Sequence, residues 1–163
     1  MSARHQTSTS AQTEALAAEL AAGLVPGDVV LVEGELGSGK TTFVRGACRA
    51  LGVDGLVTSP TFTIGQRYPG RVPVSHLDLY RVADLNDEDP DLLADYLGPD
   101  RIAFVEWPGG AVADIAGLAR VAAKVLIEHA GGDRRVVTIE APLGMDAQRN
   151  GPTDAARSAA PIP

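Results

Sequence analysis

The stretch GELGSGKTT, Gly34–Thr42, decides the fold of this chain. Gly34, Gly39, Lys40 and Thr41 fill the fixed positions of the P-loop pattern, in which two glycines separated by four residues precede a lysine and a hydroxyl residue. Glycines let backbone N–H groups turn inward around phosphate oxygens, and the following helix directs its positive dipole end at the same oxygens. We expect Lys40 to contact the terminal phosphates and the Thr41 hydroxyl to bind Mg²⁺. The stretch therefore predicts a nucleoside triphosphate site.

The remaining sequence has the context that such a loop needs. DVVLVEG (28–34) predicts a buried strand before the loop, and KTTFVRGACRAL (40–51) predicts an amphipathic helix after it. The other predicted elements are a helix over 10–24, strands over 61–68 and 71–80, an acidic helical region over 85–98, a strand over 101–106, a helix over 111–120, and a hairpin over 124–130 and 134–141. We predict an α/β, P-loop NTPase-like three-layer fold with central parallel strands and antiparallel edge strands.

Composition divides the chain into three parts. Residues 1–9 are polar, and we expect a frayed N-terminus there. Residues 10–142 carry the predicted elements and form the expected P-loop domain. Residues 143–163 are rich in Gly, Pro, Ala and Ser and lack periodicity, which predicts a disordered tail.

Charge and cysteine content limit the classes of function. The formal net charge of −7 argues against a protein that binds nucleic acid unaided, because such binding depends on Lys and Arg that neutralise phosphates. We expect no DNA partner and only an indirect contact with RNA. The single cysteine, Cys48, excludes an intrachain disulfide. No stretch approaches the roughly 20 apolar residues that span a bilayer, so we expect a cytoplasmic protein with no membrane contact.

Two acidic residues are candidates to face the loop. Glu106 ends the apolar run Ile102–Val105, and the carboxyl ends of parallel strands are where open α/β sheets bind ligands. Asp78 lies in VSHLDLYR, where strand alternation puts His76, Asp78 and Tyr80 on one face. Both acids are candidate magnesium ligands, and Asp78 can also position water. Taken alone, each acid also fits a surface position, and His76 fits a structural role better than a catalytic one.

Two further side chains are open to two interpretations. Thr61 in SPTFT is either a hydroxyl that senses the terminal phosphate or a β-branched strand residue. Trp107, the only tryptophan, either packs near the nucleotide or anchors the end of a strand.

Four pieces of the sequence together resemble the TsaE (YjeE) family of small P-loop ATPases: GELGSGKTTFVRG, SPTFTI, HLDLYR and VEWP, in the family's order and spacing. The resemblance covers most of residues 10–141. It implies slow, Mg²⁺-dependent hydrolysis of ATP to ADP in support of threonylcarbamoyladenosine synthesis in tRNA. It also implies two protein partners, TsaD and TsaB.

The same resemblance implies roles for individual residues. The cradle residues are Gly37, Ser38, Gly39, Lys40, Thr41 and Thr42. Thr41 and Glu106 match the magnesium positions, and Asp78 matches an essential aspartate of the family. We therefore expect Lys40, Asp78 and Glu106 to be catalytic. We also expect Asp78 to be a metal ligand, together with Thr41 and Glu106. Thr61 and Trp107 match residues close to the nucleotide, and the neighbourhoods of Ser10 and Arg135 match those that approach the base.

One segment departs from the family pattern, and other functions remain as alternatives. Where the family has a Leu- and Glu-rich helix after DLYR, this chain has VADLNDEDPDLLADYLG, interrupted by Pro90, so the partner-facing geometry there is open.

The main alternative function is a P-loop small-molecule kinase, although no Arg-rich lid segment is present. A GTPase would carry the guanine-binding motif Asn-Lys-x-Asp, which this sequence does not contain. The last alternative is a scaffold that keeps the loop for nucleotide binding and does not hydrolyse the nucleotide.

Overall fold

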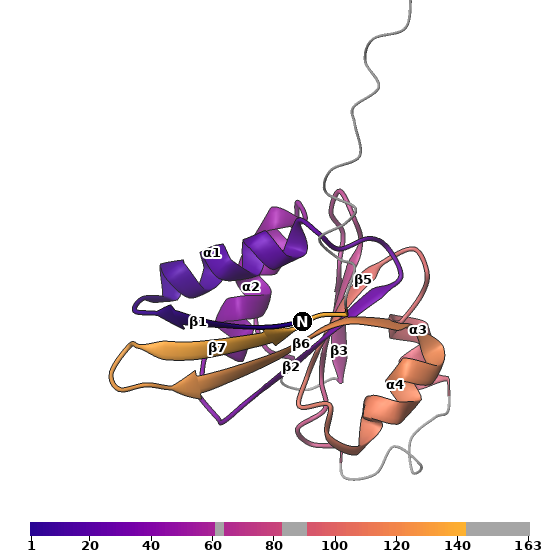
Figure 1. Cartoon of the computed structure of the whole chain (residues 1–163). Helices are drawn as coiled ribbons and strands as arrows, with labels where there is room; N and C mark the ends of the chain where they lie inside the picture. Colours follow the sequence, from indigo (N-terminus) through magenta and orange to yellow (C-terminus); the bar gives the residue numbers. More distant parts are fainter. Residues whose placement is uncertain (61–63, 83–90, 143–163) are drawn as a thin grey trace, which may run out of the picture.

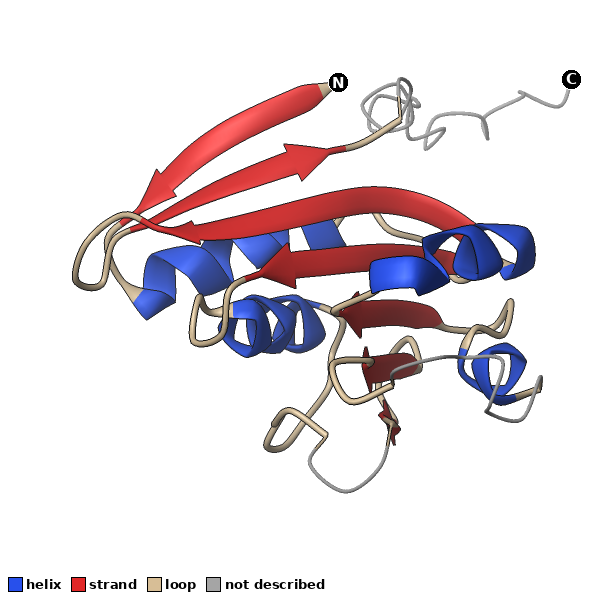
Figure 2. Cartoon of the chain, turned by 90° about the horizontal axis from the view of Figure 1, so that it is seen from below, coloured by secondary structure: helices blue, strands red, loops and turns tan. Residues whose placement is uncertain are grey.

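The computed structural model describes residues 1–60, 64–82 and 91–142. Seven strands form one sheet in the order β1-β7-β6-β2-β5-β4-β3. The strands are β1 (Ser2–Thr7), β2 (Asp28–Gly34), β3 (Gly65–Tyr68), β4 (Val74–Asp78), β5 (Ile102–Glu106), β6 (Arg120–His129) and β7 (Arg135–Glu140). In Figure 2 they follow one another from β1, beside the N label, to the short β3 at the opposite edge.

The helices cover the sheet on both faces. They are α1 (Ser10–Ala21), α2 (Lys40–Ala50), α3 (Leu92–Tyr96) and α4 (Val112–Leu118), the last preceded by the short 3-10 helix η2 (Gly109–Ala111). Figure 1 shows α1 and α2 on one side of the sheet and α3 and α4 on the other. Within the described residues, no helix is long and apolar enough to cross a membrane.

The central strands are parallel and the edges antiparallel. Strand β2 pairs in parallel with both β5 and β6, and β5 pairs in parallel with β4. The pairs β1–β7, β6–β7 and β3–β4 are antiparallel. This confirms the predicted α/β fold, with parallel strands in the centre and antiparallel strands at the edges.

Two hydrophobic cores explain why β2 is apolar from Val29 to Val32. Val30 and Val32 pack into the core beneath α1 and α2, whereas Val29 and Leu31 pack into the core beneath α3 and α4. A central strand covered on both faces has no solvent side, so its residues need no polar alternation. The buried strand fixes the point at which the chain leaves the sheet at Gly34.

Helix α2 is held in place by a close crossing with α1. A Cβ atom added at Gly46 would lie 2.4 Å from the backbone of Glu14, so only glycine permits this approach. The Glu14 carboxylate also accepts a hydrogen bond from Arg49 Nη1 at 2.6 Å, and Arg45 Nη1 lies 3.7 Å from it. The crossing fixes the start of α2, where the glycine-rich loop ends.

The expectation of a frayed N-terminus is wrong for residues 2–7. Strand β1 forms six register pairs with β7, from Ser2↔Glu140 to Thr7↔Arg135. The Thr7 and Thr13 hydroxyl oxygens lie 2.8 Å apart in a buried contact, which ties the end of β1 to α1. A polar edge strand is stabilised mainly by its backbone ladder, which composition does not reveal. The predicted tail, residues 143–163, lies outside the described residues, as do residues 83–90 of the acidic segment that follows DLYR.

Candidate functional site

The loop between β2 and α2 is open on its inner side. Gly37 has a φ of 73° and Gly39 a φ of 106°, and a Cβ atom at either position would meet no atom within 4 Å. Gly39 is the N-cap of α2, and no side chain caps that helix end. The first-turn N–H groups of α2 are therefore left for an anion, as in other anion sites at helix N-termini.

Lys40 lies inside this loop with only 5% of its surface exposed. Its Nζ donates to the carbonyl oxygens of Gly34 and Glu35, each at 2.9 Å, and lies 4.2 Å from the centre of the Trp107 ring. Burial lowers the pKa of the Lys40 ammonium, while the negative charges of Glu106 and Asp78 act in the opposite direction. A buried cation with two carbonyl partners and two nearby acids is well prepared to exchange those carbonyls for phosphate oxygens.

Glu106 meets the first turn of α2. Its side chain is 2% exposed, and its Oε1 accepts from Thr41 Oγ1 at 3.1 Å. The same Oε1 lies 2.8 Å from Nε2 of His76, on the neighbouring strand β4. Thr41 and Glu106, the two residues predicted for the metal, are thus in contact although 65 positions separate them in sequence.

Asp78 ends β4 beside Glu106, since the two residues are register partners in the parallel pair β4–β5. Asp78 Oδ2 accepts from Ser59 Oγ at 2.8 Å, and Oδ1 accepts from the backbone N–H of Tyr80 at 3.0 Å. Both carboxylate oxygens are therefore fixed by protein donors. A carboxylate held in this way can accept a proton or a hydrogen bond from water without reorienting.

These residues line one pocket of about 370 Å³. It is bordered by Leu36, Gly37, Gly39, Lys40, Thr41, Thr42, Ser59, Asp78, Tyr80, Glu106 and Trp107. Except for Ser38, Thr61, Ser10 and Arg135, every candidate named from the sequence borders it. Thr61 lies outside the described residues.

The other three candidates lie at an adjoining pocket of about 230 Å³. Its lining is Thr9, Ser10, Thr13, Ser38, Gly39, Thr42, Asp133 and Arg135, so it shares Gly39 and Thr42 with the first pocket. Arg135 Nε donates to the backbone oxygen of Ser38 at 2.8 Å, which connects the β6–β7 hairpin to the loop. The Ser38 hydroxyl is buried with no partner among the described residues. The two pockets therefore lie on either side of Gly39 and Thr42, and both are lined by polar side chains.

Trp107 has a strained backbone at the rim of the first pocket. Its φ of 52° is the only positive value among the described residues other than glycine, and such a conformation costs on the order of 1–3 kcal/mol. The backbone N–H of Trp107 donates to Val32 O at 3.2 Å. The centroid of its ring lies 4.9 Å from the centroid of the Tyr80 ring. In this conformation the indole ring lies over the Lys40 ammonium.

The donor chemistry of the first pocket fits Mg²⁺. Thr41, Asp78 and Glu106 supply only oxygen, which this ion prefers. Among the described residues no cluster of three or more His, Cys, Asp or Glu could enclose a metal. A small number of protein ligands is sufficient for Mg²⁺ when phosphate oxygens and water complete its coordination shell.

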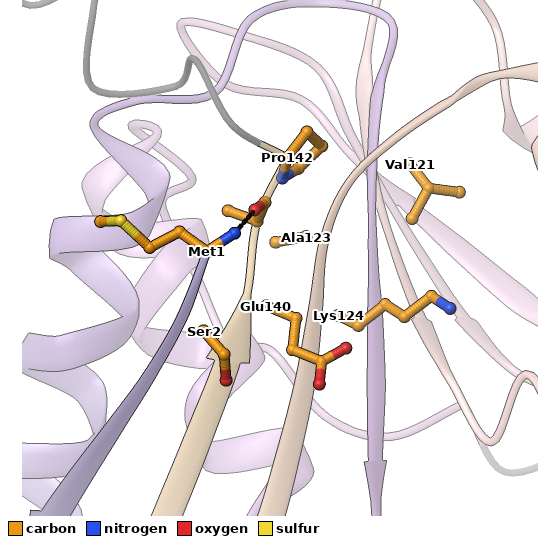
Figure 3. A pocket seen from close by; sticks show the side chains of 8 residues that line it. Met1, Ser2, Val121, Ala123, Lys124, Glu140 and Pro142 are labelled. Atoms are coloured by element: carbon orange, nitrogen blue, oxygen red, sulfur yellow. Dashed lines mark hydrogen bonds between the residues drawn. The ribbon is translucent and has the colours of Figure 1, made fainter.

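A larger cavity, of about 430 Å³, lies at the β1 edge and has a different character (Figure 3). Its charged side chains are Lys124 and Glu140, which are register partners across β6 and β7. The Met1 ammonium there donates to Ala141 O at 2.8 Å. Since no buried polar group lines this cavity, it is the weaker candidate despite its size.

Sequence reasoning missed several contacts of the site. Alternation placed His76 on the correct face of its strand, but not in contact with Glu106. Ser59, Tyr80 and Asp133 also line the two pockets. The proximity of SPTFT to the expected phosphate was the one signal that could have suggested Ser59.

Comparisons with known proteins agree with this geometry. The family model "Threonylcarbamoyl adenosine biosynthesis protein TsaE" matches residues 7–137. The tRNA threonylcarbamoyladenosine biosynthesis protein TsaE of Bacillus subtilis is 40% identical over 132 residues, which is 80% of either chain. The Streptomyces coelicolor TsaE is 44% identical over 103 residues, 61% of this chain and 70% of the relative. A crystal structure of Bacillus subtilis YdiB superimposes with a TM-score of 0.66 at 31% identity, and the match covers 86% of each chain.

Proposed function

The chain belongs to the TsaE family, and from that premise we propose that it binds and slowly hydrolyses ATP, with Mg²⁺, in support of threonylcarbamoyladenosine synthesis in tRNA. The observation that carries the proposal is the contact between Thr41 Oγ1 and Glu106 Oε1, 3.1 Å long, at an open glycine-rich loop. It joins the first turn after the loop to the carboxyl end of the neighbouring parallel strand, which is where P-loop enzymes hold their metal.

The proposed phosphate contacts follow from the loop. The N–H groups of the loop and of the first turn of α2 donate to phosphate oxygens, and Lys40 contributes the positive charge. Lys40 exchanges its hydrogen bonds with Gly34 O and Glu35 O for bonds to phosphate. The buried Ser38 hydroxyl gains a partner if the loop adjusts around the ligand.

Thr41 and Glu106 are proposed to hold the magnesium, directly or through water, with Asp78 beside them. Bound magnesium would offset negative charge on the phosphates. Asp78 orients the attacking water and accepts its hydrogen bond, because Ser59 and the Tyr80 N–H hold the carboxylate toward the pocket that it borders. The assignment leaves Asp78 more important for hydrolysis than for binding.

The adjoining pocket is proposed to take the base and ribose. Asp133 and the hydroxyls of Ser10 and Thr13 offer acceptors, and Arg135 offers donors. Adenine carries an exocyclic amine that an acceptor such as a carboxylate can bind. Guanine also carries an exocyclic amine, so this chemistry fits either purine, and the choice of ATP comes from the absence of the Asn-Lys-x-Asp motif from the sequence.

The proposed partners are the TsaD and TsaB proteins, with tRNA held by them and not by this chain. A net charge of −7 disfavours direct binding of a polyanion and leaves the RNA contact to a partner. The chain would act in the cytoplasm, where tRNA is modified.

A reconstitution tests the proposal. Purified TsaD and TsaB, tRNA, threonine, bicarbonate, ATP and the enzyme that makes the threonylcarbamoyl donor are incubated with and without this protein. We expect multiple turnovers of modified tRNA only when it is present, and none with the Lys40→Ala variant. If turnover is unchanged without it, and a screen of metabolites finds phosphoryl transfer by the protein alone, the kinase alternative replaces the proposal.

A further inference from the structure

A buried histidine holds the proposed magnesium ligand from behind. His76 is fully buried in β4, and its Nε2 lies 2.8 Å from Glu106 Oε1 on β5. It shares a face of the strand with Asp78, two residues further along. Because it does not border the pocket, His76 cannot touch a bound nucleotide directly.

The partners of its ring assign the proton. Nδ1 is buried and has no hydrogen-bond partner among the described residues. A buried N–H without a partner costs more than an unused lone pair, because carbonyl and imidazole acceptors are more often left unsatisfied than donors. The proton therefore belongs on Nε2, and His76 donates to Glu106.

Glu106 is consequently held through one oxygen. Oε1 accepts from both Thr41 Oγ1 and His76 Nε2, whereas no donor from the described residues reaches Oε2. The carboxylate borders the pocket, so Oε2 is the oxygen left for it. A neighbour that donates to a ligating carboxylate fixes its direction and raises metal affinity.

We infer that His76 is a positioning residue that orients the Glu106 carboxylate toward the magnesium of bound ATP. The inference rests on the proposed function, since it requires a magnesium ion at Glu106. It assigns the histidine of HLDLYR a role in metal affinity, and no contact with the nucleotide. The opposing interpretation is that His76 only fills the core.

Matched substitutions separate the two interpretations. In His76→Gln the side-chain amide can reach the position of Nε2 and donate to Glu106, whereas in His76→Asn it reaches only the position of Nδ1. His76→Leu removes the donor and keeps the site apolar. Ser75→Ala is the control, because Ser75 is equally buried in the same strand and its hydroxyl has no partner among the described residues.

The measurement is the dissociation constant of ATP by calorimetry, in excess Mg²⁺ and in EDTA, with the melting temperature of each variant. We expect His76→Leu and His76→Asn to lose about tenfold to a hundredfold of the gain in affinity that Mg²⁺ gives, with affinity in EDTA unchanged. His76→Gln and Ser75→Ala should keep most of it. In a Glu106→Ala background, His76→Leu should have no further effect.

Two results would overturn the inference. One is a magnesium gain in His76→Leu equal to that of the parent chain. The other is an equal loss in the Gln and Asn variants that follows their melting temperatures, which would make His76 a packing residue. If the parent chain binds ATP no better with Mg²⁺ than in EDTA, the proposed function itself fails, and that result is recognisable before any variant is made.

Discussion

Replacing Gly39 with alanine tests whether the left-handed turn of the loop builds the anion site. Gly39 has a φ of 106°, and a Cβ atom there meets nothing within 4 Å, so the substitution introduces backbone strain without a clash. Such a conformation costs a non-glycine residue about 1–2 kcal/mol. For a chain of this size each kcal/mol lowers the melting temperature by about 2–4 °C, so we expect a decrease of about 2–8 °C.

The same change should weaken ATP binding. If the peptide turns to relieve the strain, one N–H group leaves the cradle, and a hydrogen bond to a charged group contributes about 1.5–3 kcal/mol. Affinity then falls by about tenfold or more.

The control is Gly117→Ala in α4, where a Cβ also meets nothing within 4 Å and φ is not in the left-handed region. Alanine is favoured in a helix by about 0.5–1 kcal/mol, so this control should melt slightly higher.

Calorimetric ATP titration and thermal melting of both variants decide the matter. If Gly39→Ala melts at the parent temperature and binds ATP with unchanged affinity, the loop conformation is not what creates the site. If both alanine variants lose stability equally, the loss comes from the added methyl group and not from the strain at Gly39.

Three further predictions follow from the same geometry. The Asp78→Ala variant should bind ATP nearly as well as the parent chain but should not hydrolyse it, because the fixed Asp78 carboxylate orients the attacking water. A normal rate of hydrolysis in a phosphate-release assay would show that Asp78 has only a structural role. ATP with Mg²⁺ should change the fluorescence of Trp107, because Lys40 leaves the face of its ring; an unchanged spectrum at saturation, with binding confirmed by calorimetry, would remove Trp107 from the site. Cys48 is fully buried, and burial raises the pKa of its thiol to about 12. Because the thiolate is the reactive form, alkylation of Cys48 at pH 8 should be at least about a thousandfold slower in the folded chain than in urea. Equal alkylation rates in the two conditions, measured by mass spectrometry, would contradict this prediction.

The parallel centre of the fold could be predicted because its signals are local. DVVLVEG forms β2 over the residues expected, and α2 begins at the lysine of the motif. The apolar run and the glycine-rich loop each specify their own conformation, and their order along the chain fixes the parallel sheet.

The N-terminal strand could not be predicted because its partner is remote. The polar residues Ser2–Thr7 form β1 only since β7, more than 120 residues later, offers an unpaired edge. A frayed segment and an edge strand of this composition do not differ in sequence. Pairing between the two ends of the chain is a property of the completed sheet.

The candidate site was predicted in its residues but not in its contacts. Motif and strand ends identified Lys40, Asp78 and Glu106, which border one pocket. The sequence could not show that His76 Nε2 lies beside Glu106 Oε1, because alternation gives a face and not a neighbour. It could not show either that Arg135 binds a loop carbonyl, which depends on how the hairpin meets the loop.

The dissociation constant of Mg²⁺–ATP, measured by calorimetry for the parent chain and for Lys40→Ala, tests the central claim most directly. Lys40 carries the charge inside the loop, and a charged hydrogen bond to phosphate contributes about 1.5–3 kcal/mol, so affinity should fall by about tenfold to 150-fold. Lys124→Ala, at the cavity of Figure 3, should leave it unchanged. Equal affinity for ATP in Lys40→Ala and the parent chain would contradict the claim that the loop Gly34–Thr42 holds the phosphates.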